Sequence, residues 1–107
     1  MGKKEDGMKG LKQFIAKVVA KLAPRKVILF GSRARGDNTR ESDYDIIIIS
    51  EKFKGIPFTD RMTDLYRMWD ILSDVDFLCY TQEEFDIKKR QIGIVRDANS
   101  YGKLLVG

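Results

Sequence analysis

Hydrophobic residues recur at helical spacing near the start of the chain and come in short unbroken runs after it. The helical spacing covers residues 8–22, at Met8, Leu11, Ile15, Val18 and Leu22. It predicts an amphipathic helix that Pro24 ends. The apolar runs at 26–30 and 44–50 predict two strands. After its acidic start the second run is apolar on both faces, as is typical of a central strand covered on both sides.

The second half of the chain continues this alternation of helices and strands. Pro57 is expected to open a helix over 58–72, with one apolar side formed by Phe58, Met62, Leu65, Trp69 and Leu72. Residues 75–80 predict a third strand, and a Thr-x-x-Glu capping box at 81–84 predicts the start of another helix. Residues 102–106 predict a short last strand. The order of elements predicts an α/β (α+β) fold, a small mixed β-sheet with helices packed on it.

Length and composition describe one globular domain. We expect the 107 residues to form a single domain, 1–107, with 1–7 flexible. Hydrophobic content is 43% and charged content 34%, which excludes a disordered chain. The net charge of +4 is modest. Because no basic cluster is interleaved with aromatic residues, direct nucleic-acid binding is not expected.

Cysteine and histidine usage narrows the compartment and the chemistry. Cys79 is the only cysteine, so no internal disulfide forms. The sequence has neither the apolar core of a signal peptide nor a run of membrane-spanning length, so a cytoplasmic protein without a membrane partner is expected. The absence of histidine excludes imidazole bases and histidine-ligated zinc. Any catalysis must therefore use carboxylates, metals, lysine or arginine.

A turn rich in small residues follows the first predicted strand. Gly31 lets the backbone turn sharply and approach a ligand, and Ser32 offers a hydroxyl and a backbone N–H. If residues 32–35 form one helical turn, ended by Gly36, their free N–H groups point at an anion.

Two arginines in this turn leave two interpretations open. Arg33 and Arg35 either add charge-assisted bonds to phosphate oxygens or pair in solvent with Asp37 or Glu41.

Two carboxylates begin the second predicted strand. Asp43 and Asp45 point the same way, about 7 Å apart, because side chains alternate along a strand. Like charges at this separation repel, and a cation between them relieves the repulsion. Mg²⁺ is the natural candidate, since it accepts one or two carboxylates and completes its shell with phosphate and water. Asp76 on the next strand is the preferred third acid because it lies deeper in an apolar run, with Asp74 on the same face as the alternative.

The combination resembles the minimal nucleotidyltransferase family, the smallest members of the polymerase-beta-like superfamily. The family pattern is Gly-Ser, ten residues, then Asp-x-Asp. Here Gly31-Ser32, residues 33–42 and Asp43-Tyr44-Asp45 match it without insertion. The Arg33-Ala34-Arg35-Gly36 filling and the serine before the first acid are also typical of the family. The resemblance runs from about residue 11 to the end of the chain and implies the polymerase-beta-like nucleotidyltransferase fold.

The resemblance also implies an activity and a site. Gly31 and Ser32 would hold the triphosphate of ATP, and Asp43 and Asp45 would bind Mg²⁺, with two ions expected. Asp76 would complete the site and accept the proton of the attacking hydroxyl. The family transfers a nucleotidyl group, usually AMP from ATP, and releases pyrophosphate.

The acceptor is expected to come from another molecule, because many relatives carry an acceptor domain after this core and this sequence shows none. Minimal members commonly pair with an all-helical HEPN-domain toxin. In such toxin–antitoxin modules the nucleotidyltransferase is the antitoxin, a protein adenylyltransferase that modifies a tyrosine of the toxin. The rival hypothesis is a non-catalytic binding module that neutralises its partner by occlusion. Transfer to a small molecule such as an antibiotic is less favoured, because no second lobe encloses that acceptor.

Overall fold

The computed structural model describes residues 7–39, 42–91, 93, 95–96 and 101–107. Its elements are α1 (Gly7–Leu22), β1 (Lys26–Phe30), α2 (Ser32–Arg35), β2 (Tyr44–Ile49), η1 (Glu51–Phe53), η2 (Phe58–Asp60), α3 (Thr63–Met68), β3 (Val75–Tyr80), α4 (Gln82–Lys88) and β4 (Lys103–Val106). Residues 1–6, part of the segment expected to be flexible, lie outside the described residues, and Gly7 is the first residue of α1.

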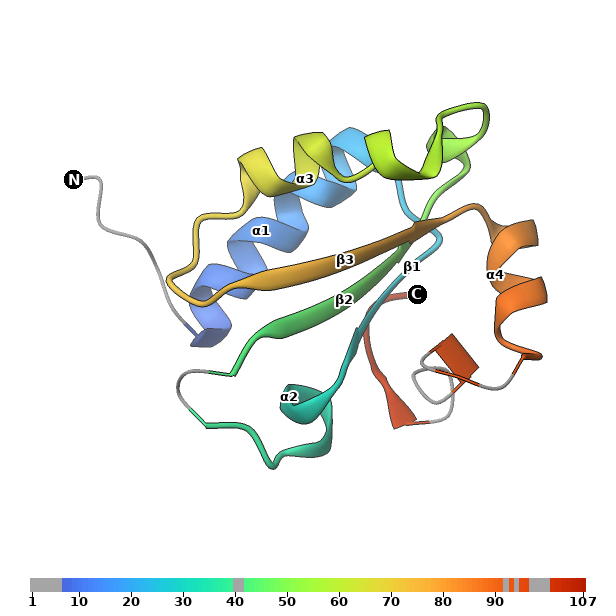
Figure 1. Ribbon diagram of the computed structural model, residues 1–107. Helices are drawn as coiled ribbons and strands as arrows, with labels where there is room; N and C mark the ends of the chain where they lie inside the picture. The colour runs from blue at the N-terminus through green and yellow to red at the C-terminus, as the bar shows by residue number, and fades with distance from the viewer. Residues whose placement is uncertain (1–6, 40–41, 92, 94, 97–100) are drawn as a thin grey trace.

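The four strands form one mixed sheet in the order β3-β2-β1-β4. β1 pairs antiparallel with both β2 and β4, while β2 and β3 are parallel. Helices α1 and α3 cover one face of the sheet, and α4 lies against the other, beside the end of β3 (Figure 1). Short α2 follows β1 directly, next to the start of β2 (Figure 1). The expected mixed sheet with helices packed on it is confirmed.

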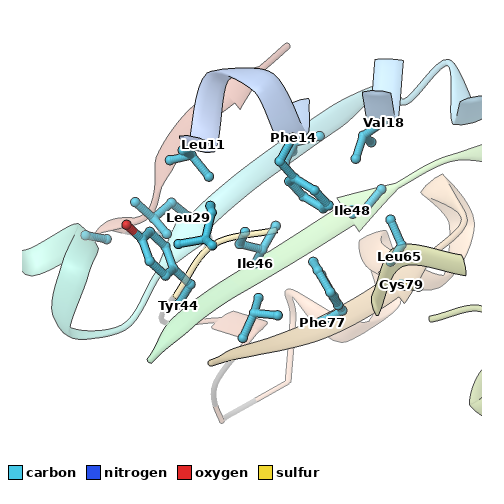
Figure 2. Close-up of a cluster of buried hydrophobic side chains, with 14 of the residues drawn as sticks. Leu11, Phe14, Val18, Leu29, Tyr44, Ile46, Ile48, Leu65, Phe77 and Cys79 are labelled. Atoms are coloured by element: carbon cyan, nitrogen blue, oxygen red, sulfur yellow. The ribbon is translucent and has the colours of Figure 1, made fainter. Parts of the chain in front are cut away.

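Strand β2 is buried on both sides and separates two hydrophobic clusters. Ile46 and Ile48 face α1, where they meet Phe14 and Val18 (Figure 2). The alternate residues of β2, Ile47 and Ile49, face α4, where they meet Tyr80 and Phe85. All four isoleucines are 0% exposed. The prediction of a central strand covered on both sides is therefore confirmed, and its rigid backbone carries the acids at its start.

The helix expected over 58–72 is wrong in length. The structure has a 3-10 turn at 58–60 and a short helix, α3, at 63–68. Trp69 leaves the helix in an extended conformation, and its indole N–H donates to the carbonyl of Ser73 at 2.8 Å. Its ring packs against Phe14 and the other aromatic residues of this cluster. This packing outweighs the helical periodicity and leaves Leu72 69% exposed, not on a buried helix side.

The remaining expectations about elements are confirmed. The first helix, the strands and the last short strand agree with the predicted ranges to within one residue. The capping box at the start of α4 is formed reciprocally by Thr81 and Glu84. Cys79 is a fully buried core residue, and burial raises the pKa of its thiol to about 12. Among the described residues, no helix has the length and apolar character needed to cross a bilayer.

Candidate active site

Gly31 brings the turn before α2 into contact with the Asp45 carboxylate. It lies between β1 and α2 with φ 74° and ψ −160°, a backbone conformation that other residues rarely adopt. A Cβ on Gly31 would stand 2.3 Å from the Oδ2 atom of Asp45. The sheet register explains this approach, because Phe30 is paired with Asp45. Glycine is therefore required at position 31 for two reasons. The turn needs a backbone conformation that other residues rarely adopt, and the Asp45 carboxylate occupies the space that a Cβ would take.

Helix α2 is a single turn that presents its first N–H groups beside this carboxylate. The carbonyl of Gly31 accepts hydrogen bonds from the N–H groups of Ala34 and Arg35, each at 3.1 Å. The N–H groups of the first helical residues, Ser32 and Arg33, precede these bonds and are the ones that a helix start offers to an anion. Gly36 ends the turn in the left-handed conformation, as expected.

Asp45 is the electrostatic centre of the site. It is partly buried, and its pKa is raised by that burial and then by the charges of Asp76 and Asp43, while Arg35 opposes the shift. The parallel register pairs Asp45 directly with Asp76 on β3. Asp43 lies one residue before β2 and is exposed. The three predicted acids therefore lie at the same end of two adjacent strands, close enough for the charges of Asp76 and Asp43 to raise the pKa of Asp45.

The register also bears on the choice between Asp74 and Asp76. Asp74 precedes β3, where its carbonyl accepts a hydrogen bond from the N–H of Tyr44 at 2.9 Å. Asp76, not Asp74, is the β3 carboxylate whose charge raises the pKa of Asp45. This geometry favours Asp76 as the third acid.

The chemistry of these donors fits Mg²⁺. Among the described residues, no group of three or more acidic or cysteine side chains is arranged so that it could hold a metal ion by itself. A closed group is not required, because Mg²⁺ uses one or two carboxylates and takes its other ligands from substrate phosphates and water. Neighbouring carboxylates that disfavour each other's charge, with the Gly31-Ser32 turn packed against one of them, are the donor set that such a cation would neutralise.

Arg33 lies on the other side of β2 from the acids. Its guanidinium donates two hydrogen bonds to the carbonyl of Ser42, at 3.0 and 2.8 Å, and one to the hydroxyl of Ser73 at 3.2 Å. It also covers the ring of Tyr44, 3.9 Å from the centroid. These contacts hold α2, the start of β2 and the turn before β3 together. Arg33 therefore positions the site from the face of β2 opposite the acids. Its phosphate role stays a prediction.

Arg35 lies on the side of the acids. It pairs with Asp37, Nε to Oδ2 at 3.4 Å, which is one of the two interpretations left open by the sequence, whereas Glu41 lies outside the described residues. Its Nη1 donates to the hydroxyl of Tyr101 at 3.2 Å. Asp37 raises the pKa of Arg35, and the Arg35 charge in turn lowers that of Asp45. An exposed cation beside Asp45 suits a role in phosphate binding, which also stays a prediction.

The family follows from a comparison with known proteins. Residues 12–105 match the model of the family described as "Polymerase beta, Nucleotidyltransferase". The chain belongs to this family. The match includes strands β1 to β3, all but the last residue of β4, and every residue of the candidate site.

A curated relative agrees with the assignment to the polymerase beta nucleotidyltransferase family. The "Putative protein adenylyltransferase MJ0604" of Methanocaldococcus jannaschii is 49% identical over 45 residues, which are 40% of this chain. The aligned part is 45% of that protein, so the chain matches less than half the length of this curated relative.

Two solved structures of similar shape point the same way, and a third shares only the fold. A "putative nucleotidyltransferase from Sulfolobus solfataricus" is 29% identical with a TM-score of 0.63, over 90% of this chain and 76% of that one. A structure described as "the toxin-antitoxin with AMP-PNP" is 26% identical with a TM-score of 0.53, over 88% of this chain and 71% of that one. BolA1 from Arabidopsis thaliana, 14% identical with a TM-score of 0.56, shares the fold alone.

Sequence reasoning missed two residues that contact the predicted site. Tyr101 reaches Arg35 from a position 66 residues further along the chain, and Ser73 reaches Arg33 across 40 residues. No local signal marks either one, because their roles come from the folding of distant segments onto α2.

Proposed function

We propose that this member of the polymerase beta nucleotidyltransferase family is a Mg²⁺-dependent enzyme that transfers AMP from ATP to a hydroxyl acceptor. The proposed acceptor is a tyrosine of a HEPN-domain toxin in the cytoplasm, so that the protein acts as an antitoxin. We further propose that residues 1–107 form one nucleotidyltransferase domain.

The contact between Gly31 and Asp45 carries the proposal. It supports a triphosphate bound by the Gly31-Ser32 turn and a metal-binding carboxylate within one site, since a Cβ on the glycine would fill the space that the carboxylate takes. Phosphate binding at a helix start and metal binding at adjacent carboxylates are the two requirements of nucleotidyl transfer.

The residues of the site divide between phosphate binding, metal binding and proton acceptance in this proposal. The N–H groups of Ser32 and Arg33 and the guanidinium of Arg35 would bind the β- and γ-phosphates. Asp43, Asp45 and Asp76 would hold Mg²⁺, two ions in the proposed complex, which supplies neutralisation of charge at the α-phosphoryl group. The Asp76 carboxylate would accept the proton of the attacking hydroxyl.

The relatives support the acceptor class. One is named a protein adenylyltransferase, and a solved neighbour is a toxin–antitoxin complex with an ATP analogue, AMP-PNP. Those descriptions concern those proteins, and we extend them to this chain as part of the proposal.

A labelling experiment tests the proposal. The protein is incubated with α-phosphate-labelled ATP, Mg²⁺ and the host's own lysate, beside the Asp43→Asn/Asp45→Asn double variant. We expect one protein to be labelled by the wild type only, which would identify the acceptor. A stable wild-type complex recovered without any label would instead favour neutralisation by occlusion.

A further inference from the structure

The layout of the site fixes the side from which an acceptor approaches. In nucleotidyl transfer the attacking and leaving oxygens lie roughly in line on opposite sides of the phosphorus. The phosphate-binding turn lies at the end of β1, on one side of β2, and Asp76 lies on β3, on the other side. With the roles proposed above, pyrophosphate would leave toward α2, and the acceptor hydroxyl would arrive over β3.

A hollow of about 370 Å³ lies further along the same face of β3. Its lining residues are Phe58, Leu78, Tyr80, Glu84 and Lys88. Leu78 and Tyr80 follow Asp76 at steps of two residues, so all three side chains point to one face, with Leu78 about 7 Å from Asp76. Phe58 is 40% exposed, and its ring lies 5.6 Å from that of Tyr80. We call this the β3–α4 hollow.

Charges of both signs surround the hollow, because Asp60 on η2 and Glu83 on α4 are exposed as well as Lys88. Both carboxylate oxygens of Glu84 accept hydrogen bonds from Arg61, whose own side chain is only 7% exposed, so these two charges cancel. Asp86 on α4 is paired in the same way with Lys89 at 3.0 Å. Lys88 remains as the exposed lysine of the lining.

We propose that the β3–α4 hollow is the subsite that recognises the acceptor polypeptide, an extended segment with an aromatic residue two positions from its acceptor tyrosine. The spacing follows from the register: side chains two residues apart in an extended segment are separated by the same distance as Asp76 and Leu78. The aromatic residue enters the hollow between Phe58 and Leu78, beside the side chain of Lys88.

The proposal rests on the proposed function, and the transfer it assists is balanced. The phenolic oxygen forms a bond to the α-phosphorus while the bond from that phosphorus to the bridging oxygen breaks. The phenolic proton goes to the Asp76 carboxylate, and pyrophosphate leaves with the bond's electron pair. The product is the tyrosyl ester of AMP.

Two synthetic pentapeptides test the subsite. One has the order phenylalanine, glutamate, tyrosine, glutamate, phenylalanine, and in the other both phenylalanines are alanine. Transfer of label from α-phosphate-labelled ATP is measured for the wild type, Phe58→Ala and Lys88→Glu. Leu72→Ala and Lys17→Glu are matched controls, because Leu72 and Lys17 are exposed and lie outside the hollow. Circular dichroism and urea midpoints establish that each variant is folded.

We expect the wild type to show a KM about tenfold lower for the phenylalanine peptide than for the alanine peptide, as burial of one aromatic side chain predicts. Phe58→Ala abolishes that difference, and Lys88→Glu raises the KM for both peptides severalfold, because each peptide carries two glutamates and the substitution puts a further negative charge in the lining. Both leave the KM for ATP within twofold, and the control variants behave as the wild type.

Other results overturn the assignment in distinguishable ways. Equal KM values for the two peptides, or no peptide labelling by an enzyme that labels a lysate protein, would show that the hollow does not read the acceptor. A raised KM for ATP in Phe58→Ala, with an unchanged peptide KM, would assign the hollow to the nucleotide. No labelling of any acceptor would refute the proposed function itself, and this inference with it.

Discussion

Replacing Gly31 by alanine tests whether the turn and the acid form one unit. The new Cβ would meet the Oδ2 atom of Asp45 at 2.3 Å, which real Cβ atoms essentially never show, and its Cγ at 3.2 Å, which is tighter than most real contacts. It would also have to adopt φ 74° with ψ −160°. The variant must therefore move the turn, the Asp45 carboxylate or both.

The expected cost has two parts. Holding a non-glycine residue in this conformation costs about 1–3 kcal/mol, and forcing the carboxylate from its rotamer costs about 1 kcal/mol more. A loss of about 3 kcal/mol lowers the Tm of a domain of this size by roughly 10–20 °C. Since small domains have about 5–15 kcal/mol of stability, the variant should fold. Urea unfolding monitored by circular dichroism measures the loss.

Two comparisons separate the clash from the backbone strain. Gly36 also has a positive φ, 85°, but a Cβ there would meet nothing within 4 Å. Gly36→Ala should therefore cost only about 1 kcal/mol. In an Asp45→Ala background the clash disappears, so Gly31→Ala should cost at least about 1 kcal/mol less than in the wild type. Equal costs at Gly31 and Gly36, or in the two backgrounds, would refute the packed contact.

Three further predictions concern the surroundings of the site. Asp45→Asn should raise the urea midpoint at pH 7, because burial and repulsion raise the pKa of this carboxyl and its charge therefore destabilises the folded state. The same variant should transfer nucleotide about a hundredfold more slowly or worse, and an unchanged rate would contradict the assignment. Arg33→Ala should cost about 1–3 kcal/mol in urea unfolding, and Arg33→Lys should recover less than half, since lysine lacks the planar fork that holds the Ser42 carbonyl. The Arg61 guanidinium lowers the pKa of Glu84 from 4.5 to about 2, so the stabilisation of the fold by this ion pair is complete above about pH 4.5 and is lost toward pH 2. Because the Glu84 side chain is 41% exposed, we expect the pair to contribute about 1 kcal/mol. Glu84→Gln should abolish this part of the pH dependence of stability.

The parts of the molecule that the sequence could predict are those encoded by neighbouring residues. Apolar runs located the strands, and the spacing between Gly31 and Asp45 is short enough for one connection to bring them together. The preference for Asp76 rested on its depth in an apolar run, and the parallel register now places it beside Asp45. The short α3 was not predictable, because the aromatic packing of Trp69 ends it and involves residues from three other elements.

The contacts of the two arginines were not predictable for the same reason. Each guanidinium has several acceptors within reach in sequence, and the fold decides which is used. Ser42 and Ser73 are brought to Arg33 by the strands that follow them. Likewise, the β3–α4 hollow exists only because η2 and α4, far apart in sequence, meet over the end of β3.

The most direct test of the central claim compares the fate of two phosphates of ATP. The wild type and the Asp43→Asn/Asp45→Asn variant are each incubated with Mg²⁺ and the host lysate that contains the acceptor protein. Each incubation is carried out once with α-labelled and once with γ-labelled ATP. The account predicts that the wild type leaves the α-label on the acceptor and releases the γ-label as pyrophosphate, and that the variant does neither. Label from the γ-phosphate on the acceptor, or equal α-labelling by the variant, would contradict nucleotidyl transfer at these residues.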